Sequence, residues 1–334
     1  MSNKHYVGVV RTSYHLLNFL TFLEKNIDIR DVVEVLFTPY WHGTSLSEDL
    51  VHYCSSMGVK IIHVKVDMLN ESISSKIKLC QTELKVVAVS LSTSLLLKIL
   101  FFKIYKKIDV FFIDDGVGSY SGFSARFKAL KREKNKFYYS ILFPFYYYAQ
   151  KILSKNIGER FSMLESPNLD VNIAYKNGII NVLTRLKSNA PKLNKPAVIF
   201  CTQPYVDMGV LSISEYKQVL STLITLCKKN EAELIIRKHP GDKIFDYCGF
   251  NTFNNTELFE SFLMRNIDYI KSVTSIDSTC LLTSKALFSI SAYRVDCSIS
   301  RFNYGGFSSQ LKYVFEKYTK IIHIDGCGEG NVAK

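Results

Sequence analysis

The 334-residue sequence has none of the motifs that mark the large metal- and nucleotide-dependent enzyme classes. No two aspartates are separated by a single residue, so the Asp-x-Asp metal clamp of many sugar transferases is missing. There is no P-loop, no Gly-x-Ser-x-Gly elbow and no His-Glu-x-x-His helix. The sequence therefore gives no support for metal-dependent chemistry, and we expect neither a metal ion nor a separate cofactor. Most histidines show no metal-ligand spacing: His5, His15, His42, His52, His63 and His323.

Paired cysteines and long apolar runs are also missing. The eight cysteines are scattered without a Cys-x-x-Cys pair, as is typical of buried, reduced thiols in the cytoplasm. Arg11 interrupts the N-terminal apolar run before it reaches the length of a signal peptide. The apolar stretch 86–102 contains Lys98 and four serines or threonines, whereas a membrane span needs about 20 mostly apolar residues. We therefore predict a cytoplasmic protein without a transmembrane segment.

Positive charge is abundant instead. The formal net charge of +12 favours anionic partners such as nucleic acid, anionic lipid or phosphorylated substrates. A basic run, 128–136, lies directly before an aromatic run, 137–148. This pair is either an interfacial anchor on the inner face of the cytoplasmic membrane, or a solvated helix followed by a helix packed in the core. No nucleic-acid-binding module is present, so we do not expect nucleic acid as a partner.

The order of apolar patterns predicts the fold class. Short apolar runs alternate with helical periodicity, which indicates βαβ units and parallel sheets. The pattern fills residues 1–165, is interrupted by Asn, Pro and Gly at 166–196, and restarts at 197. We predict an α/β protein with two Rossmann-like domains, 1–165 and 197–334, joined by a linker at 166–196. Ligands of such folds bind in a central cleft at the carboxyl ends of the strands.

The expected elements follow from these patterns. Strands are expected at 6–10, 33–37, 60–64, 84–89, 110–113, 197–201, 233–237, 269–271 and 287–291. Helices are expected at 14–24, 46–57, 95–105, 179–186, 214–230, 257–264 and 280–287.

The sequence Asp114-Asp115-Gly116 directly follows a predicted strand, where α/β sheets present their chemistry. Adjacent carboxylates repel each other, so one can keep a raised pKa that suits proton abstraction. The alternative is an ordinary Asp-Gly turn with a helix cap. A dinucleotide-binding loop is disfavoured, because the third glycine is missing and the carboxylates suit a pyrophosphate poorly.

Two further polar groups follow predicted strands in the second half. Arg237-Lys238-His239-Pro240 places a histidine beside two cations, where an imidazolium could stabilise or protonate a leaving phosphate. The alternative is a capping histidine at a strand exit. A hydroxyl-rich run, 272–279, opens an apolar helix, and its Ser275, Ser278 and Thr279 suit an anion at a helix N-terminus. The alternative there is plain capping by Ser278 or Asp277.

Taken in order, Asp114-Asp115-Gly116, His239-Pro240 and Ser278-Thr279 resemble the three short motifs of bacterial sialyltransferases and polysialyltransferases. The strand ending in Thr202-Gln203-Pro204 is similar to the start of the donor domain in glycosyltransferase family 52, the lipooligosaccharide sialyltransferases. The resemblance spans roughly residues 110–290. Asp277-Ser278-Thr279 departs from the consecutive serines found more often in these families.

The resemblance implies a GT-B type sialyltransferase that works by inversion without a metal ion. Its donor, CMP-sialic acid, would bind the C-terminal domain. Its acceptor, a glycan hydroxyl such as a terminal galactose of lipopolysaccharide, O-antigen or capsule, would bind the N-terminal domain. Asp114 or Asp115 would deprotonate the acceptor, His239 would assist departure of CMP, and Ser278 with Thr279 would hold its phosphate. The other substrate contacts that we expect are Arg11, Gly116, Tyr120, Thr202, Gln203, Pro240 and Ser275.

Several alternatives stay open at this point. The residues do not decide which aspartate is the base, although an extended chain would turn only one of them to the ligand. Thr12, Tyr14 and His15 would lie near the acceptor beside Arg11, which could instead pair with a surface carboxylate. A two-domain transferase with another activated sugar or glycerol, and a non-catalytic protein that binds nucleic acid or membrane, are the competing functions. A homodimer is also possible.

Overall fold

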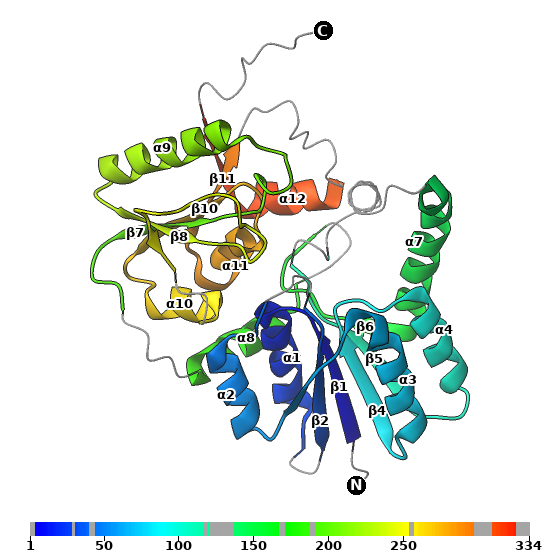
Figure 1. Ribbon diagram of the computed structural model, residues 1–334. Coiled ribbons are helices and arrows are strands. Elements are labelled where there is room, and N and C mark those ends of the chain that lie inside the picture. The colour runs from blue at the N-terminus through cyan, green and yellow to red at the C-terminus, as the bar shows by residue number, and fades with distance from the viewer. Residues whose placement is uncertain are drawn as a thin grey trace. The chain divides into compact units, whose positions relative to one another are not determined.

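The computed structural model describes residues 4–28, 31–39, 44–116, 119, 137–166, 171–186, 192–253, 257–296 and 309–324. The chain forms two compact units, residues 1–187 and 188–334 (Figure 1). The first unit thus extends through α8 (Ile173–Arg185), which falls in the segment that we expected to be a linker.

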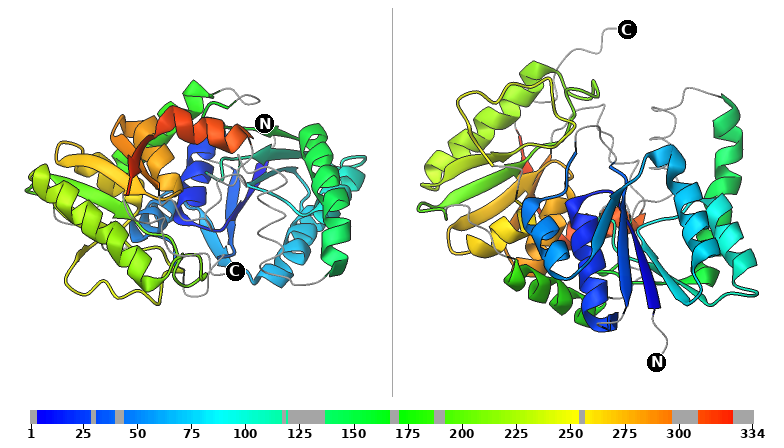
Figure 2. Two further views of the ribbon diagram at one scale, coloured as in Figure 1. Left: turned by 90° about the horizontal axis from the view of Figure 1, so that it is seen from above. Right: turned by 60° about the horizontal axis from the view of Figure 1, so that its bottom comes forward.

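The first unit is a parallel sheet with the strand order β3-β2-β1-β4-β5-β6, the order of the Rossmann fold. The helices α1, α2 and α8 cover one face, and α3, α4 and α7 cover the other (Figure 1, Figure 2). Its strands are β1 (Lys4–Val10), β2 (Val32–Phe37), β3 (Lys60–His63), β4 (Glu83–Ala88), β5 (Ile108–Phe112) and β6 (Gly158–Arg160). Its other helices are α1 (Ser13–Asn26), α2 (Glu48–Ser56), η1 (Val66–Met68), α3 (Leu69–Leu79), α4 (Thr93–Phe102) and α7 (Phe137–Ile157).

The second unit repeats this topology, with the order β12-β11-β10-β7-β8-β9 and parallel pairing throughout. Its strands are β7 (Ala197–Cys201), β8 (Glu233–Arg237), β9 (Asn251–Thr252), β10 (Ile270–Ser275), β11 (Ser291–Asp296) and β12 (Lys320–His323). Its helices are α9 (Ile213–Lys229), α10 (Phe259–Arg265), α11 (Thr279–Phe288) and α12 (Ser309–Tyr318). In each sheet the strand order reverses beside its first strand, β1 or β7, which is where such folds bind ligands.

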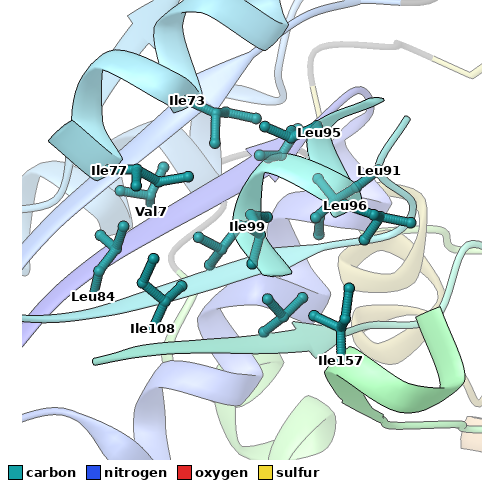
Figure 3. Close-up of a cluster of buried hydrophobic side chains, with 14 of the residues drawn as sticks. Val7, Ile73, Ile77, Leu84, Leu91, Leu95, Leu96, Ile99, Ile108 and Ile157 are labelled. Atoms are coloured by element: carbon teal, nitrogen blue, oxygen red, sulfur yellow. The ribbon is translucent and has the colours of Figure 1, made fainter. Parts of the chain in front are cut away.

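The cores explain why these elements form. In the first unit, aliphatic side chains of β1, β4 and β5 interdigitate with those of α3 and α4 (Figure 3). Val7, Val86 and Ile99 in this cluster are fully buried. In the second unit, α9 packs an apolar stripe that includes Val219 on the sheet of the same unit. The helix begins at a capping box of Ser212 and Glu215. Burial of these apolar faces stabilises each unit independently.

Several elements differ from our expectations. Helix α8 begins at Ile173, whereas we expected this helix to begin at 179, and Gly178 lies inside it, where the lack of a side chain lets α8 approach α1 closely. A Cβ atom at Gly178 would lie 2.9 Å from the Thr21 methyl group. The strand expected at 287–291 is wrong: α11 continues to Phe288, Ser289 ends it with φ of 57°, and β11 begins at Ser291. The sequence patterns also missed α3, α12, β6, β9 and β12.

Helix α7 contains the aromatic run and has Pro144 within it. None of the helices in the described ranges is long and apolar enough to cross a membrane. The basic run that precedes α7 lies outside the described residues.

Candidate active site

The first group of site residues lies at the carboxyl edge of the first sheet, after β5. Asp114 is almost fully buried, and both of its carboxylate oxygens accept hydrogen bonds from the backbone. Oδ1 accepts from the Gly116 N–H at 2.6 Å, and Oδ2 accepts from the Met163 N–H at 3.0 Å. Asp114 therefore shapes the turn and ties the exit of β5 to the chain after β6. Gly116 has a φ of 66°, a conformation that favours glycine, so it serves this turn.

Asp115 has a different environment from its neighbour. Its side chain is 22% exposed, and its Oδ1 lies 2.6 Å from Nε2 of the buried His15 in the first turn of α1. The Arg11 N–H donates to His15 Nδ1 at 3.3 Å, so a neutral imidazole holds its proton on Nε2 and donates it to Asp115. Of the two aspartates, Asp115 is therefore the one that is exposed to solvent and oriented by a second side chain.

The carboxyl end of β1 provides the frame of this pair. Thr12 caps α1 by accepting a hydrogen bond from the His15 N–H at 3.2 Å, which fixes the first turn from which His15 projects. Arg11 is half-buried at the same edge, and the Tyr14 hydroxyl donates to the Met163 sulfur at 3.9 Å. Tyr120, which we expected to contact substrate, lies outside the described residues.

In the second unit, the exits of β7 and β8 are tied together at their carboxyl ends. The His239 N–H donates to the Thr202 hydroxyl oxygen at 2.9 Å, and the Gly241 N–H donates to His239 Nδ1 at 3.0 Å. A neutral His239 therefore also keeps its proton on Nε2. Burial, together with the charge of Arg237, lowers the pKa of His239 to about 4. Without a bound phosphate the imidazole is thus neutral near pH 7, so the imidazolium that the sequence suggested would form only beside an anion.

The His-Pro loop has a buried support that sequence reasoning did not identify. Asp242 is buried and accepts a hydrogen bond from the Tyr247 hydroxyl at 2.5 Å, and its backbone N–H closes a turn to the His239 carbonyl at 3.0 Å. Burial raises the pKa of Asp242. Pro240 is exposed at the tip of this turn. The only sequence signal for Asp242 was its place at the end of the His239 motif.

The third motif lies at the carboxyl end of β10, next to β7. Ser278 is the N-cap of α11 and accepts from the Cys280 N–H at 3.3 Å, whereas Thr279 is half-buried in the first turn. Asp277 accepts a hydrogen bond from the Tyr205 hydroxyl, and burial raises the pKa of Asp277 to about 6. The amide groups of this helix start and the capping hydroxyl are suited to an anion.

Two of the expected substrate contacts are structural instead. Ser275 is fully buried, and its hydroxyl donates to the Cys201 carbonyl at 2.7 Å, so it holds β10 against β7 and cannot contact a ligand. Thr202 is also buried, with its oxygen accepting from the backbone of His239. Gln203, the next residue, is half-buried at this edge.

A buried cluster of charged and sulfur groups lies directly behind Ser278 and Thr202. Arg237 donates from Nη1 to the Cys280 sulfur at 3.2 Å, and its guanidinium lies 4.6 Å from the ring centre of Phe259. A hydrogen bond from Cys201 and the charge of Arg237 lower the pKa of Cys280 despite its burial. Burial raises the pKa of the nearby Glu260 to about 7. The sequence indicated buried thiols but not this pairing with arginine.

No group of three or more His, Cys, Asp or Glu side chains is placed to hold a metal ion within the part of the chain that the structure describes.

Comparisons with known proteins bear on both the family and the fold. A family model described as alpha-2,8-polysialyltransferase (POLYST) matches residues 49–295, most of the chain. This chain belongs to the alpha-2,8-polysialyltransferase family. The resemblance to bacterial sialyltransferases is therefore confirmed, and the protein is a glycosyltransferase. No curated protein sequence matches it.

The solved structures similar to this sialyltransferase share its architecture. UDP-GlcNAc 2-epimerase from Methanocaldococcus jannaschii has a TM-score of 0.53 at 11% identity, with 97% of this chain and 89% of that chain covered. A second UDP-N-acetylglucosamine 2-epimerase has a TM-score of 0.50 at 10% identity, with 97% and 85% covered. The GT-B domain of a Photobacterium damselae sialyltransferase has a TM-score of 0.45 at 12% identity, with 96% and 99% covered. The expected fold class, an α/β protein with two Rossmann-like parallel sheets, is confirmed by the strand order of the two units.

Proposed function

We propose that this sialyltransferase transfers sialic acid from CMP-sialic acid to a hydroxyl of a bacterial surface glycan, with inversion and without a metal ion or further cofactor. The observation that supports this most strongly is the Asp115–His15 pair, a partly exposed carboxylate held at the carboxyl edge of the sheet by a buried imidazole. A positioned carboxylate of this kind is suited to general base catalysis.

In the proposed reaction, Asp115 takes the proton of the acceptor hydroxyl while the oxygen of that hydroxyl attacks the anomeric carbon of sialic acid. The bond from that carbon to the CMP phosphate oxygen breaks, and CMP carries away the electron pair. Asp114 cannot share the role of Asp115, because its two oxygens are already bound by backbone N–H groups in a buried turn.

The second unit is proposed to hold the donor. His239 would donate a hydrogen bond from Nε2 to the phosphate oxygen on which charge develops, and the phosphate would raise its low pKa by charge attraction. The start of α11, with Ser278 and Thr279, would bind the other phosphate oxygens. CMP leaves as a monophosphate ester with less charge than a diphosphate, so these groups can suffice without a metal ion.

The acceptor is proposed in terms of its end group. Our expectation from the sequence is a terminal galactose of lipopolysaccharide, O-antigen or capsule. The name of the matching family adds a terminal sialic acid, joined by an alpha-2,8 linkage, as a second acceptor to test. We also propose that the enzyme works in the cytoplasm, which is supported by the free, buried Cys201 and Cys280 beside the donor site.

The test is CMP release from CMP-sialic acid, with and without EDTA, over glycans that end in galactose or in sialic acid. We expect acceptor-stimulated turnover that persists in EDTA. Asp115→Asn should lower kcat by about 10²- to 10⁴-fold with unchanged CMP affinity. Asp67→Asn, an exposed matched control, should retain full activity.

Asp114→Asn separates the two aspartates further. An amide cannot accept hydrogen bonds at both of its atoms, so this variant should lose about 1–3 kcal/mol of unfolding free energy, whereas Asp115→Asn should melt like wild type. Folded protein that neither binds CMP in a calorimeter nor turns over with any acceptor would overturn the proposed donor.

A further inference from the structure

Exposed apolar side chains are concentrated on α4, the turn after it, and α7. Nine of the 21 large apolar side chains that are exposed in the described residues lie there. The two helices lie beside each other in the first unit (Figure 1, Figure 2). We define the α4–α7 face by Leu97, Phe101 and Ile104 together with Phe145, Tyr148 and Ile152. Ile104 is 79% exposed and Phe145 is 73% exposed, so most of each residue is in contact with solvent.

The spacing of these residues makes each helix apolar on two sides. In α4, Leu95, Leu96 and Ile99 are buried in the core, yet Leu97 and Phe101 are exposed four residues apart on the solvent side, and Ile104 is exposed in the turn that follows the helix. In α7, Leu153 packs on the core while positions 145, 148 and 152 form an outward row. Surface helices normally have a polar outer face, so an apolar one indicates that it contacts something.

Two hydrogen bonds hold these helices side by side in the same direction. The Gln150 side chain donates to the Leu91 carbonyl at 2.6 Å, and Lys103 Nζ donates to the Ile157 carbonyl at 3.1 Å. Leu91 follows the carboxyl end of β4, so the α7 residues before Gln150 start at the level of the sheet edge that carries Asp115. The two groups of exposed apolar side chains therefore lie on neighbouring helices of one unit.

The charge on this face selects the occupant. Neither 93–107 nor 137–157 contains an aspartate or glutamate, and Lys98, Lys151 and Lys155 are exposed between the apolar side chains. A second copy docked through the same face would bring these lysines against one another. Aromatic rings settle at headgroup depth in a bilayer, and lysines extend to anionic headgroups, so both residue types suit a lipid surface.

We propose that the α4–α7 face is the docking surface of this protein for an anionic lipid bilayer. The exposed rings and aliphatic side chains enter the interface, and Lys98, Lys151 and Lys155 contact the headgroups. Docking in this way places the sheet edge of Asp115 near the membrane, where a lipid-linked acceptor would be presented. Only this last consequence rests on the proposed function, and the docking itself does not.

The experiment is flotation of the full chain with phosphatidylcholine vesicles, prepared with and without phosphatidylglycerol. Each lysine near an anionic surface contributes about 1 kcal/mol, roughly a five-fold change in binding. We therefore expect Lys98→Glu, Lys151→Glu and Lys155→Glu together to weaken binding at least about 100-fold. Phe101→Ser with Ile104→Ser and Phe145→Ser should weaken it more than about ten-fold.

The second unit offers matched controls. Lys228→Glu with Lys229→Glu on α9, and Ile213→Ser with Ile244→Ser, alter exposed residues outside the α4–α7 face and should leave flotation unchanged. Wild-type binding should require phosphatidylglycerol and weaken as salt shortens the Debye length. The lysine set is exposed, so it reports on docking even where an apolar variant folds poorly.

The proposal is overturned if the α4–α7 variants float like wild type, if the controls lose binding equally, or if binding ignores phosphatidylglycerol. It is also overturned if sedimentation shows that these substitutions dissociate a wild-type dimer, because a second copy then covers the face. The rate of CMP release with a soluble acceptor should be unchanged in all the variants. That readout separates failure of docking from failure of the proposed reaction.

Discussion

Replacement of His15 tests whether Asp115 acts as a positioned base. His15→Ala removes the Nε2–H whose nitrogen lies 2.6 Å from Asp115 Oδ1, but it keeps the Thr12 cap, because there the donor is the backbone N–H of residue 15. A hydrogen bond to a charged group is worth about 1.5–3 kcal/mol. If that energy orients the base in the transition state, kcat should fall by roughly 10- to 150-fold.

The expected kinetic signature is specific. The KM for CMP-sialic acid should stay unchanged, since the proposed donor contacts lie in the second unit. His15→Gln should recover part of the loss, because its amide N–H can reach toward Asp115 from a side chain of similar length. The double variant His15→Ala with Asp115→Asn should be no slower than Asp115→Asn alone, because His15 is expected to act through Asp115.

Initial rates at saturating donor and acceptor, normalised to the folded fraction from thermal melts, provide the measurement. Wild-type kcat in folded His15→Ala would refute the argument. So would an undiminished loss in the Asp115→Asn background, since His15 would then act independently of the aspartate.

Three further predictions concern protonation and stability. In NMR of the unliganded protein, the C2–H resonance of His239 should report a ring that becomes protonated near pH 4. Because the unfolded state protonates this ring near pH 6.5, up to about 3 kcal/mol of unfolding free energy should be lost as pH falls from 6.5 to 4. Titration near 6.5 in the folded protein would contradict this. Arg237→Met should raise the pKa of Cys280, read from thiolate absorbance, and should lower the free energy of unfolding in urea by about 2–4 kcal/mol. An unchanged pKa of Cys280 would show that the guanidinium does not stabilise the thiolate. Glu83→Gln should lower the free energy of unfolding by about 2 kcal/mol at pH 7, because hydrogen bonds from two lysines lower the pKa of Glu83 to about 2. Wild type should lose this contribution only as pH falls from 4.5 towards 2. An equal loss in the exposed Glu71→Gln control would argue against this account.

The sequence predicted the regular part of the fold because β-strands and amphipathic helices leave local signatures. The strands β1, β7 and β8 were placed to within a few residues from short apolar runs alone. The errors fall where tertiary contacts decide. Gly178 reads as a helix breaker, yet the close approach of α8 to α1 requires it. Ser289 ends α11 in a left-handed conformation that no residue type nearby would suggest.

The candidate site was predicted in outline for a related reason. Motifs at strand ends locate the correct edges, because parallel strands bring their carboxyl ends together. Which atoms meet there depends on residues far apart in the chain. His15 and Asp115 could not be paired from sequence, and nothing local distinguishes the structural Asp114 from Asp115. Ser275 carries the right functional group for a phosphate but points into the sheet.

Both units orient a histidine by the same means, which links the fold to the proposed chemistry. In each, a backbone N–H at a strand exit donates to Nδ1: Arg11 to His15, and Gly241 to His239. The proton of the neutral ring is thereby fixed on Nε2 in both. In the first unit the Nε2–H of the His15 ring orients a carboxylate that is proposed to gain a proton. In the second the Nε2–H of His239 is proposed to face a phosphate that gains negative charge. One local solution, placed at the same edge of two sheets with the same strand order, thus supplies a hydrogen-bond donor at each end of the proposed transfer.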